Sequence, residues 1–193
     1  MDEALSVFKK YLNSIVSMSD QSFDLCRDLV KYRKVEKNEI LLREGEKSNF
    51  IFFTVSGLLR NYHLKDVNEV NTCFCLEKSI ACSFESFVHD TASQEYIQAL
   101  EKSTVLQLSR KDMMKLIEID ESWSQLRREL TEIECIRLSN RVSAMNFATA
   151  SEKYLALMDK EPELIQRVSV QYIASYLGIS RETISRIRAK VVR

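Results

Sequence analysis

The sequence predicts an α+β protein in which a β-rich segment precedes one long helix and a final pair of short helices. Three observations support this fold class. Short apolar runs recur about every ten residues between Lys31 and Ser109, which is typical of antiparallel strands. Apolar residues then follow helical spacing from about residue 121 to residue 146. Two short apolar stripes, separated by Gly178, end the chain.

Length and composition limit the class of protein. The 193 residues can form one large or two small cores, and an apolar fraction of 45% is ordinary for a globular protein. No apolar run approaches the roughly 18 residues of a membrane span, and the N-terminal sequence MDEALSVFKK has no long apolar core of the secretory type. Five cysteines, an odd number, fit a reducing compartment. We therefore expect a cytoplasmic protein without a membrane partner.

The first 109 residues divide into a helical and a β-rich part. Helical spacing predicts a helix before Ser19 and a second one from about Ser19 to Val30. The apolar runs that follow predict a sandwich or barrel of short antiparallel strands. These runs are Ile40–Leu42, Phe50–Val55, Leu58–Leu64, Val70–Leu76, Ile80–Phe84, Tyr96–Leu100 and Thr104–Leu108. Gly57 lies between two of them, where a tight hairpin needs a positive φ.

Helical spacing returns after Ser109. A short helix from Lys111 to Glu118 leads to a helix over residues 121–146, about 39 Å long at 1.5 Å per residue. A heptad-like seam along it predicts a dimerisation helix, with packing on its own β domain as the alternative. The seam comprises Leu126, Leu130, Ile133, Arg137, Asn140 and Ala144. A further helix, Ser151 to Lys160, is expected to stop near Pro162, and residues 161–168 to form a linker.

The last 25 residues, Ser169–Arg193, predict a helix-turn-helix. Val170, Ile173 and Leu177 form one apolar stripe, and Ile184, Ile187 and Val191 form the next. Gly178 suits the left-handed end of the first helix, and Ser180 suits the cap of the second. Arg181, Glu182, Ser185 and Arg186 lie off the stripe and face outward. An ordinary helical hairpin with a solvated basic face is the alternative.

Positive charge is concentrated at this end of the chain. From Ser180 onward there are five basic residues and one acid, Glu182, on a chain whose net charge is zero. The basic residues are Arg181, Arg186, Arg188, Lys190 and Arg193. A local basic patch of this kind favours contact with nucleic-acid phosphates.

The order of these segments resembles the cyclic AMP receptor protein/Fnr (Crp-Fnr) family of bacterial transcription regulators. The resemblance is carried by GISRETISRI at residues 178–187 and by EGEKSNFIFFTVSGLLRNYH at residues 44–63. It implies a cyclic-nucleotide-binding-like β-roll (a double-stranded β-helix) with flanking helices over residues 1–120. It further implies a dimerisation helix over 121–147 and a helix-turn-helix DNA-binding domain over 148–193. Family members usually continue into a β wing; none is evident here, and we expect its absence to reduce affinity more than base choice.

The resemblance also implies partners and roles. We expect a homodimer on two-fold symmetric double-stranded DNA, with RNA polymerase as a further partner. The base-reading residues would be Arg181, Glu182 and Arg186, because an Arg fork matches guanine and a carboxylate accepts from cytosine. The phosphate contacts would be Ser180, Arg188 and Lys190.

The ligand positions of cyclic-nucleotide-binding members are altered in this chain. Their Gly-Glu pair falls on Cys82 and Ser83, and their Arg-Ser pair on Ser93 and Gln94. The segment from residue 79 to residue 94 contains no Arg, so a cyclic phosphate would lack a counter-charge. We therefore expect no control by cyclic AMP, and an effector of unknown identity. Glu85 is either a displaced ribose ligand or, on the simpler view, a solvated carboxylate.

The remaining side chains of this segment suggest no other chemistry. The interior could hold another small molecule or be filled by Phe74, Phe84 and Phe87. Cys73 and Cys75 share one face of a strand, with Cys82 nearby. Iron–sulfur sensors of the family instead concentrate ligands near the N-terminus, where this chain offers only Cys26. His63 and His89 are isolated, so we expect buried structural cysteines, no metal and no cofactor.

The sequence also lacks the motifs of common enzymes, including Gly-x-Ser-x-Gly and His-Glu-x-x-His. The absence of these motifs argues against an enzyme, and the resemblance implies a transcription regulator. The alternative is a small-ligand sensor or protein-interaction module whose helix-turn-helix does not read DNA.

Overall fold

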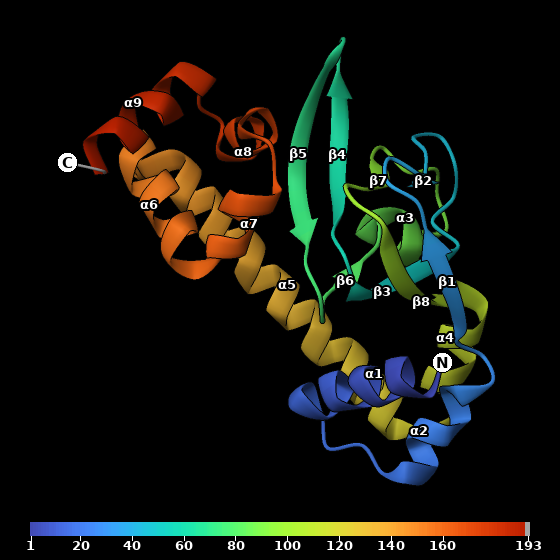
Figure 1. The fold of residues 1–193 in the computed structure, drawn as a ribbon. Helices are drawn as coiled ribbons and strands as arrows, with labels where there is room; N and C mark the ends of the chain where they lie inside the picture. The colour runs from blue at the N-terminus through green and yellow to red at the C-terminus, as the bar shows by residue number, and fades with distance from the viewer. Residues whose placement is uncertain (192–193) are drawn as a thin grey trace.

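The structure, a computed structural model, describes residues 1–191 (Figure 1). Arg193 and the residue before it, which end the predicted helix-turn-helix, lie outside the described residues. Two N-terminal helices, a β-roll, one long helix and a C-terminal group of helices follow one another along the chain. The α+β fold class predicted from the sequence is confirmed.

The N-terminal helices cover one end of the roll. Helices α1 (Asp2–Ile15) and α2 (Asp20–Arg27) pack against β3 (Phe50–Ser56), α4 (Arg110–Ile119) and the first half of α5 (Glu121–Phe147). The apolar stripe of α1 predicted from helical spacing is buried. Trp123 is enclosed in the same core, and its indole N–H donates to the carbonyl oxygen of Ser22 at 2.9 Å. This core fixes the base of α5 to the roll.

The β-roll consists of two four-stranded antiparallel sheets. Their strand orders are β1-β8-β3-β6 and β2-β7-β4-β5. Inward-facing side chains such as Val35, Phe52 and Ile97 fill the space between the sheets. The remaining strands are β1 (Lys31–Val35), β2 (Ile40–Leu42), β4 (Leu59–Lys65), β5 (Asn68–Cys75), β6 (Ile80–Ala81), β7 (Tyr96–Ala99) and β8 (Ser103–Ser109).

Three local elements differ from the sequence prediction. The run Ile80–Phe84 is not one strand, because β6 ends at Ala81 and Phe84 begins the short helix α3 (Phe84–His89). Strand β1 was not expected, since of its residues KYRKV only the last is buried and the apolar signal is weak. The predicted linker after α6 contains helix α7 (Pro162–Arg167), because a proline at the first helical position has no N–H to leave unpaired.

The C-terminal helices share a core with the roll. Helices α6 (Ala150–Lys160), α8 (Val170–Leu177) and α9 (Arg181–Val191) surround buried Tyr154 and Ile184. Leu58 and Phe74 of the roll belong to the same cluster. Figure 1 shows α5 running from the N-terminal helices to this C-terminal group, with α8 beside β5. The helix-turn-helix is therefore docked on the roll.

The residues of the predicted α5 seam lie in different environments. Leu126 is buried against the N-terminal helices, whereas Ile133, Asn140 and Ala144 are exposed. The second half of α5 is largely exposed and presents several apolar side chains to the surface. These are Ile133, Ile136, Leu138, Val142, Met145 and Phe147.

None of the helices within residues 1–191 combines the length and the apolar character that are needed to cross a membrane.

We expect Gly57→Ala to destabilise the fold more than Gly45→Ala. Both glycines have a positive φ, +93° and +86°, so either alanine introduces backbone strain of about 1–3 kcal/mol. A Cβ on Gly57 would also lie 2.7 Å from Ser103 Cα, whereas a Cβ on Gly45 meets nothing within 4 Å. Urea denaturation of both variants measures the difference. Equal losses would show that the close approach to Ser103 is unimportant.

Candidate functional site

The turn between α8 and α9 has the geometry predicted from Gly178 and Ser180. Gly178 adopts φ 65° and ψ 36°, and the N–H of Ile179 donates to Ala174 O at 3.0 Å. The N–H of Thr183 then donates to Ser180 Oγ at 3.2 Å, which caps α9. Left-handed glycine followed by an N-cap serine holds the two helices at a fixed angle.

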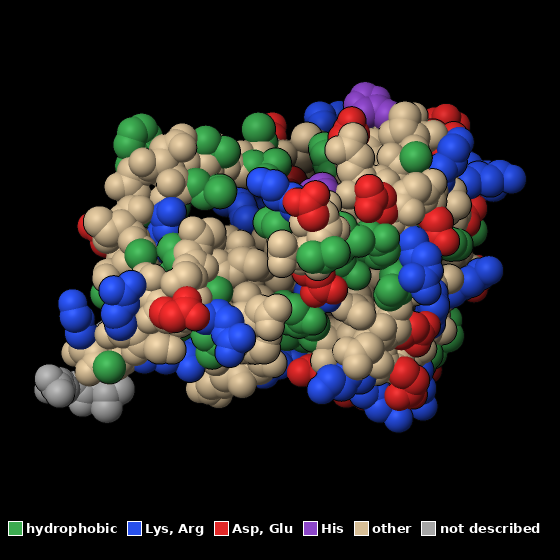
Figure 2. Space-filling view, turned by 90° about the horizontal axis from the view of Figure 1, so that it is seen from above, with side chains coloured by type: hydrophobic (Ala, Val, Ile, Leu, Met, Phe, Trp, Pro, Cys, Tyr) green, Lys and Arg blue, Asp and Glu red, His purple; other side chains and the backbone are tan. Residues whose placement is uncertain are grey.

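The three candidate base-reading residues lie on one exposed face of α9. Arg181, Glu182 and Arg186 are all exposed, while Ile184 and Ile187 on the opposite face are buried. Hydrogen bonds from its own backbone N–H and from the Ser180 hydroxyl hold the pKa of Glu182 below its usual value. Lys and Arg side chains are visible on the surface around the end of α9 (Figure 2). The exposed face carries two cations and one carboxylate that stays ionised.

The candidate phosphate contacts have different environments. Lys190 is exposed, and Ser180 is exposed with its hydroxyl engaged as a helix cap. Arg188 is half-buried, and its Nε donates to Tyr154 Oη at 2.7 Å. This contact gives Arg188 a packing role that the sequence did not indicate.

The helix-turn-helix contacts β5 of the roll through polar side chains. Ser175 of α8 accepts from the Asn71 N–H at 3.1 Å and from Asn71 Nδ2 at 2.8 Å. Arg141 of α5 donates to the carbonyl oxygens of Asn71, Thr72 and Tyr176 at 2.9–3.2 Å. Arg141 therefore joins the roll, the long helix and α8 at one point.

A second arginine is buried at this interface. The Arg60 side chain is 1% exposed and forms an ion pair with Glu69 at 2.8 Å. Its guanidinium lies 4.0 Å from the ring of Tyr62 and 3.9 Å from the ring of Tyr172 in α8. Beside it, a cleft of about 800 Å³ separates the β4–β5 hairpin from α8 and the start of α9.

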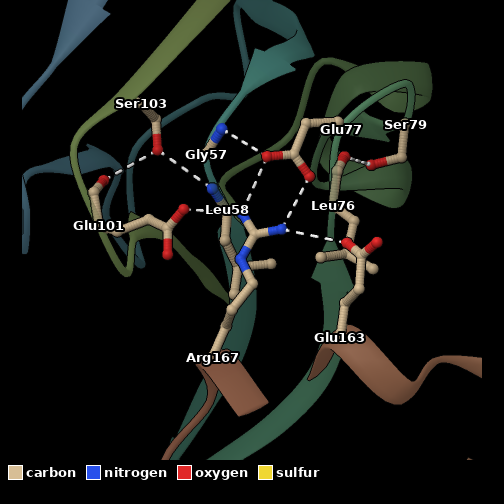
Figure 3. A network of polar contacts seen from close by, with 9 residues as sticks. All are labelled: Gly57, Leu58, Leu76, Glu77, Ser79, Glu101, Ser103, Glu163 and Arg167. Atoms are coloured by element: carbon tan, nitrogen blue, oxygen red, sulfur yellow. Dashed lines mark hydrogen bonds and ion pairs between the residues drawn. The ribbon is translucent and has the colours of Figure 1, made fainter. Parts of the chain in front are cut away.

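Arg167 at the end of α7 forms a third contact with the roll (Figure 3). It donates to both carboxylate oxygens of Glu77 at 2.9 Å and to Glu101 at 2.7 Å. Glu163 lies 3.4 Å away. Glu77 also accepts from the Gly57 N–H at 2.8 Å, so the hairpin turn is part of the network. The Arg167 hydrogen bonds lower the pKa of Glu77 to about 2.

The altered ligand positions of the roll are occupied by a hydroxyl network. Ser93 Oγ lies 2.9 Å from Ser83 Oγ and accepts from the Glu95 N–H at 3.1 Å. Both serines are buried, the carbonyl oxygen of Cys82 accepts from Asn61 Nδ2, and Gln94 is exposed. The structure brings Ser83 and Ser93 together with Cys82 beside them. Glu85 is exposed on α3, away from this network.

Glu95 is a member of this network that sequence reasoning missed. Burial raises its pKa, and the Thr72 hydroxyl donates to its carboxylate at 3.3 Å. The signal was available, because Glu95 immediately precedes β7 and has the same parity as the buried Ile97 and Ala99, which favours the same side of the chain. A half-buried acid therefore lies beside the position where the resemblance would require a cation.

Phe74, Phe84 and Phe87, named as one possible filling of the roll, do not fill its interior. Phe84 is exposed, Phe87 packs with the N-terminal helices, and Phe74 packs against Tyr176 of α8 with ring centroids 5.2 Å apart. Phe52 occupies the interior instead. No group of three or more His, Cys, Asp or Glu side chains is placed to hold a metal ion in the part of the chain that the structure describes.

Comparisons with known proteins agree with this architecture. The cyclic nucleotide-binding domain family matches residues 32–120. The chain is 25% identical over 190 residues to the transcriptional activator protein Anr of Pseudomonas aeruginosa, covering 89% of this chain and 75% of Anr. It is 26% identical to the transcriptional activator protein FnrA of Stutzerimonas stutzeri with the same coverage. The chain is thus similar to Crp-Fnr transcription regulators over most of its length.

Solved Crp-Fnr structures support the fold. FixK2 from Bradyrhizobium japonicum superposes with a TM-score of 0.65 over 84% of each chain, at 20% identity. Anr and FnrA are both named as transcriptional activators.

We expect the stabilising effect of Glu77 to depend on pH. Its folded pKa of about 2 lies below the ordinary 4.5, so the ionised form stabilises the fold fully above pH 4.5. This contribution is lost as the pH falls from about 4.5 toward 2. At pH 7, Glu77→Gln should lower the free energy of unfolding by about 1–3 kcal/mol, because hydrogen bonds to Arg167 are weakened.

Denaturation curves between pH 7 and pH 3 test this expectation. The difference between wild type and Glu77→Gln should shrink toward the acid end. The matched control is Glu163→Gln, since Glu163 is more exposed and farther from Arg167. A difference of the same size for both variants at every pH would contradict the assignment.

Proposed function

We propose that this protein is a homodimeric, sequence-specific DNA-binding transcription regulator of the Crp-Fnr type whose activity is independent of cyclic AMP. The observation that carries the proposal is the exposed face of α9, on which Arg181, Glu182 and Arg186 project together from a capped helix. In this proposal residues 1–120 are the sensor, residues 121–147 the dimer helix and residues 148–193 the DNA-binding domain.

The chemistry of the exposed face suits a major groove. An arginine fork can donate to guanine O6 and N7 together, and the ionised Glu182 can accept from the amino group of cytosine. Lys190 and the cap residue Ser180 suit phosphate contacts, which position a protein without selecting sequence. Because Arg188 Nε donates to Tyr154 Oη, only the remaining N–H groups of the Arg188 guanidinium would be able to contact a phosphate. Anr and FnrA are named as transcriptional activators, which supports a role in transcription regulation for this chain. We therefore propose RNA polymerase as a further partner.

The exposed half of α5 supports a homodimer. Ile133, Ile136, Asn140, Ser143 and Phe147 are exposed and follow one another at steps of three and four residues. This spacing forms a stripe that can pair with a second copy of the same helix. An isolated monomer would leave these side chains in water, at a cost of about 25 cal/mol per Å² of apolar surface that a dimer would bury.

The interior of the roll argues against cyclic AMP. A cyclic phosphate at the Ser83–Ser93 pair would lie near Glu95, and Arg137 of α5 is already paired with Glu134 at 2.7 Å. An anion placed beside a half-buried acid is disfavoured unless a cation balances the two charges.

DNA binding by selected variants tests the proposal. We expect Arg181→Ala to weaken binding to a site selected from random DNA by about 1–3 kcal/mol and to relax one base position. We expect Lys190→Ala to weaken binding to selected and to random DNA equally. It should also reduce the slope of log affinity against log salt concentration by about one, because one phosphate contact is lost. Added cyclic AMP should change neither affinity.

The control is Lys111→Ala, which removes an exposed lysine of α4 far from α9 and should bind like wild type. If Arg181→Ala weakened binding to selected and to random DNA equally, Arg181 would not be a base-reading residue. An absence of DNA binding even at low salt would favour a ligand sensor or protein-interaction module instead.

A second variant pair tests the dimer. Ile136→Glu should shift the protein from dimer to monomer in sedimentation velocity, because it places charge on the proposed stripe. Val142→Glu is the matched control: Val142 is 58% exposed and Ile136 62%, but Val142 lies about 120° away around α5. Dissociation by Val142→Glu alone would assign the interface to another face of α5.

A further inference from the structure

Two thiols lie together inside the roll, at the wall nearest α5. Cys73 and Cys75 are on the same face of β5, and their Sγ atoms are 3.7 Å apart. Cys75 is 2% exposed and Cys73 is half-buried. Cys82 lies near this pair, whereas Cys26 is enclosed in the N-terminal core and Cys135 is exposed on α5.

The two thiols have unequal chemistry. A hydrogen bond from Cys75 and the nearby Arg137 guanidinium lower the pKa of Cys73, against the effect of burial. The same hydrogen bond, together with burial, raises the pKa of Cys75. Thiolates are the nucleophilic form of cysteine, so Cys73 is the reactive partner and Cys75 remains a thiol next to it.

We propose that Cys73 and Cys75 form a modification site that hydroperoxides convert reversibly into an intramolecular disulfide. The Cys73 thiolate attacks the peroxide, a sulfur–oxygen bond forms, the oxygen–oxygen bond breaks, and water or an alcohol leaves. The sulfur of Cys75 then attacks the resulting sulfenic acid, the sulfur–sulfur bond forms, and a second water leaves with the Cys75 proton. Two thiols lose two electrons and two protons in total, and the peroxide gains them.

The backbone spacing allows this bond under strain. Residues two apart on a strand have Cα atoms about 6.6 Å apart, at a rise of 3.3 Å per residue, near the upper limit for a disulfide. Strained disulfides are easily reduced, so the product would be reversible by cellular thiols.

The position of Cys73 connects this chemistry to the helix-turn-helix. The pairing of β4 with β5 shifts register between Asn61 and Tyr62, so that Asn61 pairs with Cys73 and Tyr62 with Asn71. The bulge in β5 thus lies next to Cys73, at the residues whose carbonyls accept from Arg141. Asn71 also donates to Ser175 of α8. Drawing Cys73 toward Cys75 would therefore move the contacts that hold α8 on the roll.

Thiol mapping of the full chain tests the site without reference to DNA. The reduced protein is treated with hydrogen peroxide, blocked with N-ethylmaleimide and digested. We expect two fewer labels per chain and a mass lower by two hydrogen atoms in the tryptic peptide Asp66–Lys78, which contains both thiols. Chymotrypsin cuts after Phe74, between the two cysteines, and the disulfide should keep the two fragments joined until dithiothreitol is added.

Single variants assign the roles. Cys75→Ser should stop at a sulfenic acid on Cys73 that dimedone traps, and Cys73→Ser should form no disulfide. Cys82→Ser and Cys135→Ser are the controls and should behave like wild type. Resistance of the wild-type pair, oxidation confined to Cys135, or a bond from Cys73 to Cys82 would each overturn the proposal.

The regulatory part rests on the proposed DNA-binding function. Oxidation should change the affinity of wild type for its selected DNA at least about fivefold, the lower end of usual allosteric coupling. Under the same treatment, Cys75→Ser should change less. A disulfide that forms while the reduced protein binds no DNA would refute the DNA-binding function and leave the thiol site standing. A disulfide that leaves DNA affinity unchanged would refute its regulatory role.

Discussion

One guanidinium, that of Arg167, holds three carboxylates together where the C-terminal helices meet the roll. Glu77 and Glu101 come from two turns of the roll, and Glu163 comes from α7. Three acids around one base carry a net negative charge, so the cluster is stable only while the base is present. Because Glu77 also accepts from the hairpin turn at Gly57, the docking of the helices and the shape of the hairpin are stabilised by the same interaction.

The apolar and polar parts of this interface support each other. Leu58 and Phe74 extend the core of the C-terminal helices into the roll, which excludes water from the surrounding hydrogen bonds. Within that environment, Arg60 and Arg141 are each bonded to backbone or side-chain acceptors and each stack on a tyrosine of α8. The arginines thus orient α8 by direction-dependent contacts, while the apolar residues supply most of the burial.

How much could be predicted from the sequence depends on the distance over which each signal acts. The α8–α9 turn was predicted closely, because Gly178 and Ser180 determine the backbone conformation only of the few residues next to them. Strand β1 and helix α7 were missed, since one lacks apolar alternation and the other begins at a proline that usually suggests a break. The contact of Arg188 with Tyr154 spans 34 residues and has no local signal. Glu95 is an intermediate case. Its spacing from Ile97 and Ala99 indicated the side of the chain on which it lies, but its hydrogen-bond partners had no signal in the sequence.

The length of α5 has a mechanical consequence. Its 27 residues form a rod of about 40 Å that is anchored at one end by Trp123 and is followed at the other by the C-terminal helices. For such a lever, a tilt of about 5° at the anchored end displaces the far end by about 3.5 Å. That displacement equals one base-pair step along a DNA strand, about 3.4 Å. Once the contacts of Arg141, Arg167 and Ser175 with the roll are released, a small rotation of α5 would therefore be sufficient to move the proposed recognition helix by one base-pair step.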